Sequence, residues 1–497
     1  MPKIRHLLVV GMVAILLGQP VGAEDLLQVY RQSQESDPTL KAAAASQQAS
    51  QEAKPQAKAL LLPNVGVTAS RGSIFGVVGV PVDSYSNDTH SYTIGLTQSI
   101  YNRANQVQQR LAEAVVKQAD VDFSNAEDQL ILRVAQGYFG VLSAIDDLTF
   151  ATAEKNAFAH QLEQANRRFE VGLATITDVY DAQARFDGAV SSEISAINNL
   201  ADARELLRQL SGIDYQQLNL LSERMPLALP QPSDPEQWVR MALDSNLGLR
   251  SASFGVDQAR ENIKLQKAGH YPSLDLNLNR ADVDSFASTR VLSSEVNLQL
   301  TVPLYSGGAV SSRSRQAAYS YEASRQNLEN LQRDTIRIVR DAYRGQETAI
   351  SQIQALNQTR VSTRSALEAT QAGYEVGTRT IVDVLNAERN VYLAEREYAS
   401  SRYSYIANYL VLKQAAGQLS AEDMVEINGW LGEAIPVSGV STTPVEQPQA
   451  VNPNTDNNKA PAYGGKASIS SGESFSAGPS HSKAPTNNKK ATKSSGK

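Results

Sequence analysis

Two aspartates occupy the same place in two copies of one short phrase. "RFEVGLATITDVYDAQ" begins at Arg168, and "GYEVGTRTIVDVLNAE" begins at Gly373, about 205 positions further on. Asp178 and Asp383 are the eleventh residue of each phrase. A carboxylate at such a fixed place could cap a helix, or it could act on another molecule. The spacing within the phrase alone leaves both roles open.

Each phrase reads as a tight turn between two helices. It holds a glycine, then a threonine three residues on, then the aspartate after three more: Gly172, Thr175, Asp178, Gly377, Thr380 and Asp383. Glycine suits the turn because a positive φ costs little only for that residue. The threonine is expected to open the return helix. The aspartate then falls in its first turn, where a negative charge favours the positive end of the helix dipole.

The other residues that could carry chemistry are sparse. The chain has no cysteine, which excludes disulfides, thiolate metal sites and a cysteine nucleophile. Between 24 and 435, the histidines are His90, His160 and His270, which are isolated from one another. There is no phosphate loop, no H-E-x-x-H and no G-x-S-x-G motif. We therefore expect no enzyme, no catalytic residue, no cofactor and no metal. The net charge of -6 argues against a nucleic-acid partner.

The two ends of the chain differ from its body. Basic residues precede an apolar run at 7–17, and Val21-Gly22-Ala23 is a small-residue cleavage pattern, so 1–23 is predicted to be a secretory signal peptide. Residues 436–497 are rich in Ser, Thr, Asn, Pro, Gly and Lys and have few large apolar side chains, which predicts a disordered low-complexity tail. Between them no stretch approaches the apolar length of a membrane helix. The body is either soluble outside the cytoplasm or crosses a membrane as β-structure.

Two long proline-free runs have helical periodicity. One spans 105–168 and the other starts at Ala317. Apolar or small residues recur at alternating steps of four and three, as in a heptad seam. In the second run these are Ala317, Tyr321, Ser324, Leu328, Leu331, Thr335, Ile338 and Ala342. Each run could form one helix of about 60 residues, roughly 90–100 Å long. The phrase and a shorter helical run follow each, ending near 210 and 414.

Other segments alternate between apolar and polar residues. They are "YTIGLTQSIY" from Tyr92, "SLDLNLN" from Ser273, "EVNLQLTVPLY" from Glu295, and a weaker stretch after Pro63. Such segments are typical of membrane-barrel strands, but an amphipathic strand of a soluble sheet has the same pattern. Four strands cannot close a barrel, so in the first case two or three copies of the chain must share one.

The body therefore reads as two structural repeats, at 24–232 and 233–435. Each is predicted to run helix, strand, strand, long helix, phrase and helix. "AKALLLP" before the first strand matches "QKAGHYP" before the third, and Tyr101 and Tyr305 are expected to close the second and fourth strands.

The chain resembles the TolC family of outer-membrane channel-tunnels over nearly all of 24–435. The resemblance rests on "YEVGTRTIVDVLNAE" at 374–388, "RFEVGLATITDV" at 168–179 and "VPLYSGG" at 302–308. It implies an α+β membrane protein that forms a homotrimer. Each chain would give four strands to a twelve-stranded outer-membrane β-barrel and its long helices to a periplasmic α-helical barrel. Segments 213–237 and 422–435 would form a small mixed α/β equatorial belt.

The resemblance also implies a function and partners. The chain would be a passive, gated exit duct for multidrug efflux and/or type I protein secretion, seated in outer-membrane lipid and extending into the periplasm. Its partners would be a periplasmic adaptor and an inner-membrane RND pump or ABC exporter. The inner-membrane partner would supply the energy for transport. The lack of cysteine separates it from lipid-anchored members. The alternative is a secreted coiled-coil structural protein without a channel, which accounts for the heptads but not for the four alternating segments.

Site residues follow from the same resemblance. Gly172 and Gly377 would form the hairpin turns. Tyr374 and Arg379 would form a gate latch with Thr177 and Asp178. Asp383 would line the pore constriction and set selectivity. Asn386 stands where the family pattern has a second aspartate, so one of two charged rings is expected to be missing.

Overall fold

The computed structural model describes residues 24–78, 83–285 and 288–437. The predicted signal peptide at 1–23, and residues 438–497 of the predicted tail, lie outside this part of the chain.

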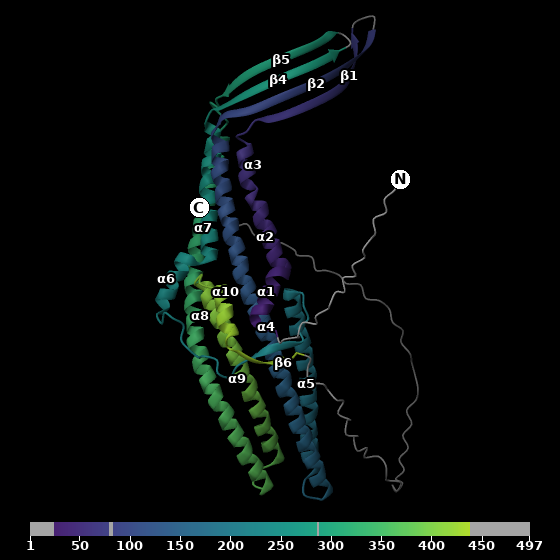
Figure 1. The fold of residues 1–497 in the computed structure, drawn as a ribbon, viewed down its shortest axis with the longest axis vertical. Coiled ribbons are helices and arrows are strands. Elements are labelled where there is room, and N and C mark those ends of the chain that lie inside the picture. Colours follow the sequence, from purple (N-terminus) through teal and green to yellow (C-terminus); the bar gives the residue numbers. More distant parts are fainter. Residues whose placement is uncertain (1–23, 79–82, 286–287, 438–497) are drawn as a thin grey trace, which may run out of the picture. The chain divides into compact units, whose positions relative to one another are not determined.

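Long helices and a four-stranded sheet dominate the described residues (Figure 1). The first half contains α1 (Leu26–Ser36), α2 (Pro38–Gln51), α3 (Ala53–Ala59), β1 (Asn64–Val78), β2 (Asp83–Asn102), α4 (Arg103–Glu170), α5 (Ile176–Ser211) and β3 (Gln217–Leu221). The second half contains α6 (Pro235–Ser245), α7 (Leu247–Lys267), the 3-10 turn η1 (Ala268–His270), β4 (Ser273–Ser285), β5 (Ser288–Thr301), α8 (Ala309–Glu375), α9 (Ile381–Ala415), α10 (Ala421–Asn428) and β6 (Leu431–Pro436).

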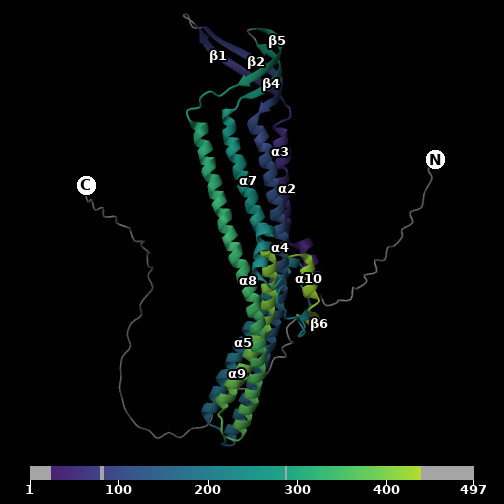
Figure 2. The ribbon, with the colours of Figure 1, turned by 90° about the vertical axis from the view of Figure 1, so that its left-hand side faces the viewer.

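The two predicted long helices are confirmed as α4 and α8, of 68 and 67 residues. Both run without a break because no proline interrupts them. Asn102 caps α4 by accepting a hydrogen bond from the amide of Ala104 at 2.9 Å. Helix α8 starts after Gly308, whose φ of 80° glycine adopts at little cost. Each long helix packs against its return helix, α4 on α5 and α8 on α9, as two antiparallel hairpins (Figure 2).

The sheet joins strands from both halves in the order β1-β2-β4-β5, with every neighbour antiparallel. The central pairing runs from Thr89 opposite Ser285 to Asn102 opposite Ser273, with a bulge between Ser99 and Tyr101. β1 and β5 are the outer strands of this sheet, and their outer edges are unpaired within the described chain.

The fourth strand ends earlier than the alternation predicts. β5 stops at Thr301, so Val302 and Leu304 lie outside it and Tyr305 does not close it. Pro303 explains the difference, because proline has no N–H to donate to a neighbouring strand. Leu304 is 92% exposed in the connection to α8.

A second, smaller sheet forms where the resemblance places the belt. β3 pairs antiparallel with β6, with Leu218 opposite Ile435 and Gln217 opposite Pro436. Pro436, predicted as the first residue of the tail, therefore belongs to a strand, and Val437 is buried. Hydrophobic periodicity did not predict β6, because its pairing partner β3 lies more than 200 residues away.

The main apolar core gathers around Tyr138 of α4. Tyr138 is fully buried and donates a hydrogen bond to the carbonyl of Asn219 in β3 at 2.8 Å. Side chains from both hairpins, from the N-terminal segment and from the β3–β6 region contribute to this core, including Leu26, Leu142, Leu207, Leu218, Ile406 and Met424. A second cluster joins Trp238 of α6 to Val339 and Tyr343 of α8.

Both hairpins turn at a glycine with positive φ, 76° at Gly172 and 78° at Gly377. The turns close with the same backbone contacts. The amide of Leu173 donates to the carbonyl of Arg168, and that of Thr378 to the carbonyl of Gly373, each at 2.8 Å. A Cβ placed on Gly377 would meet no atom within 4 Å, so any cost of a side chain there comes from the backbone conformation.

We therefore predict opposite effects for two glycine substitutions. Gly377→Ala should lower the free energy of unfolding by about 1–2 kcal/mol, since a Cβ disfavours positive φ. Gly188→Ala, inside α5 and also in open space, should raise it by about 0.5–1 kcal/mol. Urea midpoints of the two purified variants, at equal protein concentration, measure the difference. A midpoint unchanged by Gly377→Ala would contradict the role of the turn.

Candidate functional site

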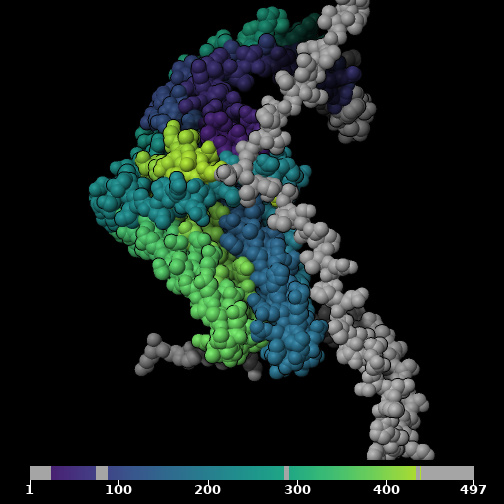
Figure 3. Space-filling model, turned by 60° about the horizontal axis from the view of Figure 1, so that its bottom comes forward, coloured from purple at the N-terminus to yellow at the C-terminus, as the bar shows by residue number. Residues whose placement is uncertain are grey.

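The ends of the two hairpins lie against each other, and this contact is the candidate functional site (Figure 3). A third apolar cluster connects them. Its buried members are Phe158, Leu162, Ala165, Ala182, Ala189, Ile381 and Leu385, with Tyr374 packed against them. The first three come from α4, the next two from α5 and the last two from α9. The repeated phrases are therefore brought together in space.

Both return helices begin with the same capping box. Thr175 Oγ1 accepts from the amide of Asp178 at 3.3 Å, and Asp178 Oδ2 accepts from the amide of Thr175 at 2.8 Å. The corresponding distances for Thr380 and Asp383 are 3.2 and 2.9 Å. The aspartates thus satisfy amides that the start of a helix would otherwise leave unpaired.

Asp383 remains ionised at neutral pH. Hydrogen bonds from the backbone and then the side chain of Thr380 lower the pKa of its carboxyl, and the nearby positive charge of Arg379 lowers it further. Although Asp383 caps the helix, its carboxyl stays accessible to solvent. Asp383 can therefore cap α9 and still present a negative charge at the hairpin end.

Asn386, one turn further along α9, is in contact with the other hairpin. Its Oδ1 accepts a hydrogen bond from Arg185 Nη2 of α5 at 3.0 Å. Sequence reasoning did not single out Arg185. It lies two residues beyond the end of the first phrase, and the residue 205 positions later is the uncharged Asn390, so the repeat does not mark it. A cation therefore accompanies the amide at the position where a second aspartate was expected.

The four predicted latch residues form no hydrogen bond or ion pair with one another within the described chain. Tyr374 lies instead under the guanidinium of Arg168, whose Cζ is 4.4 Å from the ring centroid. Arg379 forms none of the ion pairs found among the described residues, and its side chain packs beside Gly373. Thr177 is exposed, and Asp178 is engaged in its own cap.

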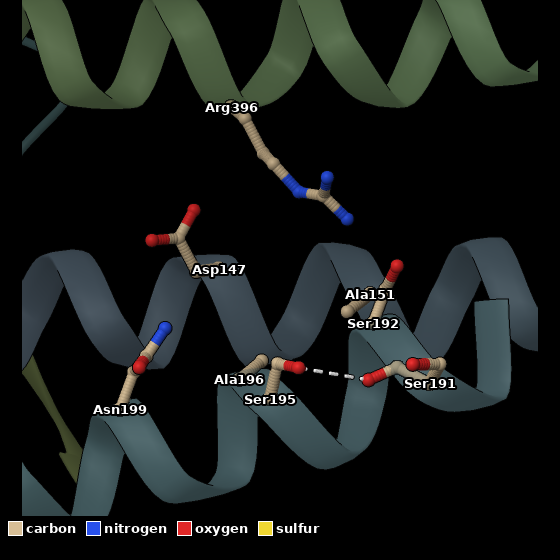
Figure 4. A pocket seen from close by; sticks show the side chains of 8 residues that line it. All are labelled: Asp147, Ala151, Ser191, Ser192, Ser195, Ala196, Asn199 and Arg396. Carbon is tan, nitrogen blue, oxygen red and sulfur yellow. Dashed lines mark hydrogen bonds between the residues drawn. The ribbon is translucent and has the colours of Figure 1, made fainter. Parts of the chain in front are cut away.

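A polar hollow of about 260 Å³ lies between α4, α5 and α9 (Figure 4). Its lining residues are Asp147, Ala151, Ser191, Ser192, Ser195, Ala196, Asn199 and Arg396. Arg396 is held by Glu154 at 3.0 Å, and the Ser195 hydroxyl donates to the carbonyl of Ser191. This lining contains no histidine, cysteine or lysine that could activate a serine.

Two further properties concern the described residues only. None of their helices combines the length and the apolar character needed to cross a membrane. Their His, Asp and Glu side chains form no group of three suited to a metal ion.

Comparisons with known proteins match most of the chain. The family model described as "Outer membrane efflux protein" matches residues 29–213 and 238–418. The chain is 38% identical over 422 residues to "Outer membrane protein TolC" of Vibrio cholerae serotype O1, covering 84% of this chain and 95% of that protein. It is 35% identical to TolC of Escherichia coli K12, covering 85% and 88%. It is 29% identical to "Alkaline protease secretion protein AprF" of Pseudomonas aeruginosa, covering 83% and 89%.

Solved structures share the fold at lower sequence identity. The CmeC outer-membrane channel of Campylobacter jejuni matches with a TM-score of 0.68 and 17% identity, covering 82% of this chain and 90% of that one. VceC of Vibrio cholerae matches with a TM-score of 0.66 and 17% identity, covering 79% and 96%. Matched through both hairpins and over most of its relatives' length, the chain belongs to the outer membrane efflux protein family.

Proposed function

We propose that the chain is a TolC-like outer-membrane exit duct for multidrug efflux, type I protein secretion or both. The observation that carries this proposal is the 38% identity to a TolC protein over 95% of that protein's length. Relatives named for efflux and for protease secretion support both uses. The duct is passive, has no enzymatic activity and needs no cofactor. A periplasmic adaptor and an inner-membrane RND pump or ABC exporter energise it.

The assembly we propose is a homotrimer. The unpaired outer edges of β1 and β5 would pair with neighbouring copies and give a twelve-stranded outer-membrane barrel, because strand amides in lipid need partners. Exposed apolar residues support this arrangement. Val296, Leu298 and Leu300 alternate along β5 and would face lipid, and Ile194 and Leu206 of α5 would face another copy.

The chain is organised, in this proposal, as a signal peptide at 1–23, two structural repeats at 24–232 and 233–435, and a tail that begins after Val437. The helical hairpins would form the periplasmic tunnel, with Gly172 and Gly377 at its far end. Because the protein does no chemistry, its function concentrates where leakage is controlled, at these hairpin ends.

Asp383 is proposed to line the constriction. Threefold symmetry would place three ionised carboxylates around one axis, which attracts cations and repels anions. Asn386 contributes no charge, and the neighbouring Arg185 adds a positive one, so the charged region would be confined to a single ring. Tyr374 and Arg379, with Thr177 and Asp178, are proposed to latch the inner hairpin between neighbouring helix pairs. The contact of Tyr374 with Arg168 would strengthen the latch within one chain.

The alternative is a coiled-coil structural protein without a channel. It would be extracted without detergent and would not conduct. The family match, which includes β1, β2, β4 and β5, and the match over most of the length of TolC proteins disfavour it.

The channel function itself is tested by expression in a strain that lacks its own duct. We expect the full chain to restore drug resistance, protein secretion or both. The purified complex should have the mass of three chains without a covalent lipid and should conduct in planar bilayers. A monomer that does not conduct would refute the proposal.

Selectivity should depend on Asp383. We expect Asp383→Ala to move the reversal potential in a salt gradient toward zero, and Asn386→Asp to tighten block by polyvalent cations. Asp187→Ala is the control, because it removes an exposed carboxylate from α5 of the other hairpin and should leave the reversal potential unchanged. If Asp383→Ala retains full cation preference, the carboxylate is only a helix cap.

The latch should restrain opening. Tyr374→Phe combined with Arg379→Ser should raise single-channel conductance, because it removes a hydroxyl and a cation from the hairpin end. Tyr180→Phe, at an exposed tyrosine of α5, serves as the control. An unchanged conductance in a properly assembled double variant would exclude the latch.

A further inference from the structure

One buried carboxylate differs from the others in the described chain. Six Asp or Glu residues are buried, and five of them have a cationic partner: Asp37 with Arg133, Glu154 with Arg396, Glu193 with Lys155, Glu395 with Arg360 and Asp423 with Lys413. These five pairs have N···O distances between 2.6 and 3.0 Å. The sixth residue, Glu388, is only 7% exposed and takes part in none of the ion pairs of the described residues.

Glu388 also lacks a complete set of hydrogen bonds. Its Oε2 is buried with no hydrogen-bond partner, and the same is true of Oε1 of Gln161. Gln161 belongs to α4 of the first hairpin and Glu388 to α9 of the second, so these acceptor oxygens lie in the contact between the two hairpins. Two unpaired acceptors in a buried contact call for a hydrogen-bond donor, and a proton on the carboxyl would provide one.

The charged and titratable groups that act on Glu388 come from α4 and α9. From α4, His160 favours the ionised carboxylate and Glu154 disfavours it. Tyr392 faces it from α9 itself. Arg364 of α8 acts on Tyr392 and is paired with Glu395 at 3.1 Å. Arg185 of α5 is bonded to Asn386. These two cations of α8 and α5 are therefore committed to other partners.

Burial is the dominant influence on this carboxyl. It raises the pKa of Glu388, Glu154 raises it further, and the neighbouring Gln161 and His160 offset only part of the rise. Separation of the hairpins would expose the carboxyl to water and return its pKa toward the ordinary value. The packed arrangement therefore holds the proton more tightly than the separated one.

We propose that Glu388 is a proton-binding site that couples the contact between the two hairpin ends to pH. A neutral carboxyl keeps α4 and α9 packed together, and an ionised one favours their separation. This contact lies within one chain, so the inference goes beyond the proposed duct and does not depend on Asp383 being the constriction.

The direction of the effect follows from proton linkage. The separated state has the lower pKa and binds fewer protons, so the ratio of separated to packed ends rises with pH. The rise is confined to the range between the ordinary and the raised pKa, and one titrating group gives at most about tenfold per pH unit. Below and above this range the ratio is constant.

Spin labels on the two turns can measure this ratio in the full-length protein in detergent. Leu173 and Val376 are 78% and 75% exposed, so replacing both with cysteine leaves the packed surfaces intact. The chain has no other cysteine to be labelled. Labelled chains diluted with unlabelled ones report the distance between the two turns of one chain. We expect the population with the longer distance to increase between pH 4 and pH 9.

Glu388→Gln should hold the ends packed and abolish the pH response, since the amide is never ionised. Glu397→Gln, at an exposed carboxylate of the same helix, should retain it. Glu388→Met is a second neutral variant in case the glutamine variant does not assemble. A distance independent of pH in the unsubstituted protein, or a full response in either Glu388 variant, would overturn the inference. Asp383→Ala should leave the response intact, which separates this test from that of the constriction.

Discussion

The hydrogen bond from Tyr138 to the carbonyl of Asn219 lies at the centre of the contact on which the rest of the structure depends. A helix of 68 residues cannot be stable by itself, because most helical stability comes from burying an apolar face. Around Tyr138 the chain supplies that burial, since both hairpins, the N-terminal helix and the β3–β6 region share one core. Away from this core, each hairpin is held by its own helix pair and by the smaller clusters. The hairpin ends can therefore differ in arrangement while the centre is kept.

At the hairpin ends, identical backbone geometry carries different side chains. The two turns have the same glycine conformation and the same capping box. Capping needs only groups within one phrase, which explains why both copies contain them. The contact between the hairpins instead uses residues that are not repeated: Arg185 on Asn386, Arg168 on Tyr374, and Glu388 beside Gln161. The repeat thus determines how each hairpin turns, and the departures from it determine how the two hairpins meet.

The same distinction explains what sequence reasoning could predict. Local signals located the long helices, the glycine turns and the capping aspartates, because each depends on residues a few positions apart. Features set by distant partners were harder to locate. Ile338 belongs to the predicted seam of α8 but is 41% exposed, whereas Val339 is fully buried because it packs on Trp238 of α6. Arg185 and Glu388 likewise look like ordinary helix residues until α5, α4 and α9 are placed together.

The pairing of β2 with β4 has a consequence for the order in which the parts of the chain fold. β1 and β2 are adjacent in sequence and can pair as soon as both are synthesised, but β2 waits for a partner that begins at Ser273. About 170 residues separate the end of β2 from that partner, and closing so long a loop is slow compared with forming helices. During this interval a nascent chain would carry an unpaired strand edge, which favours aggregation. The arrangement of the sheet thus leaves one edge of β2 without its partner until the second half of the chain has been synthesised.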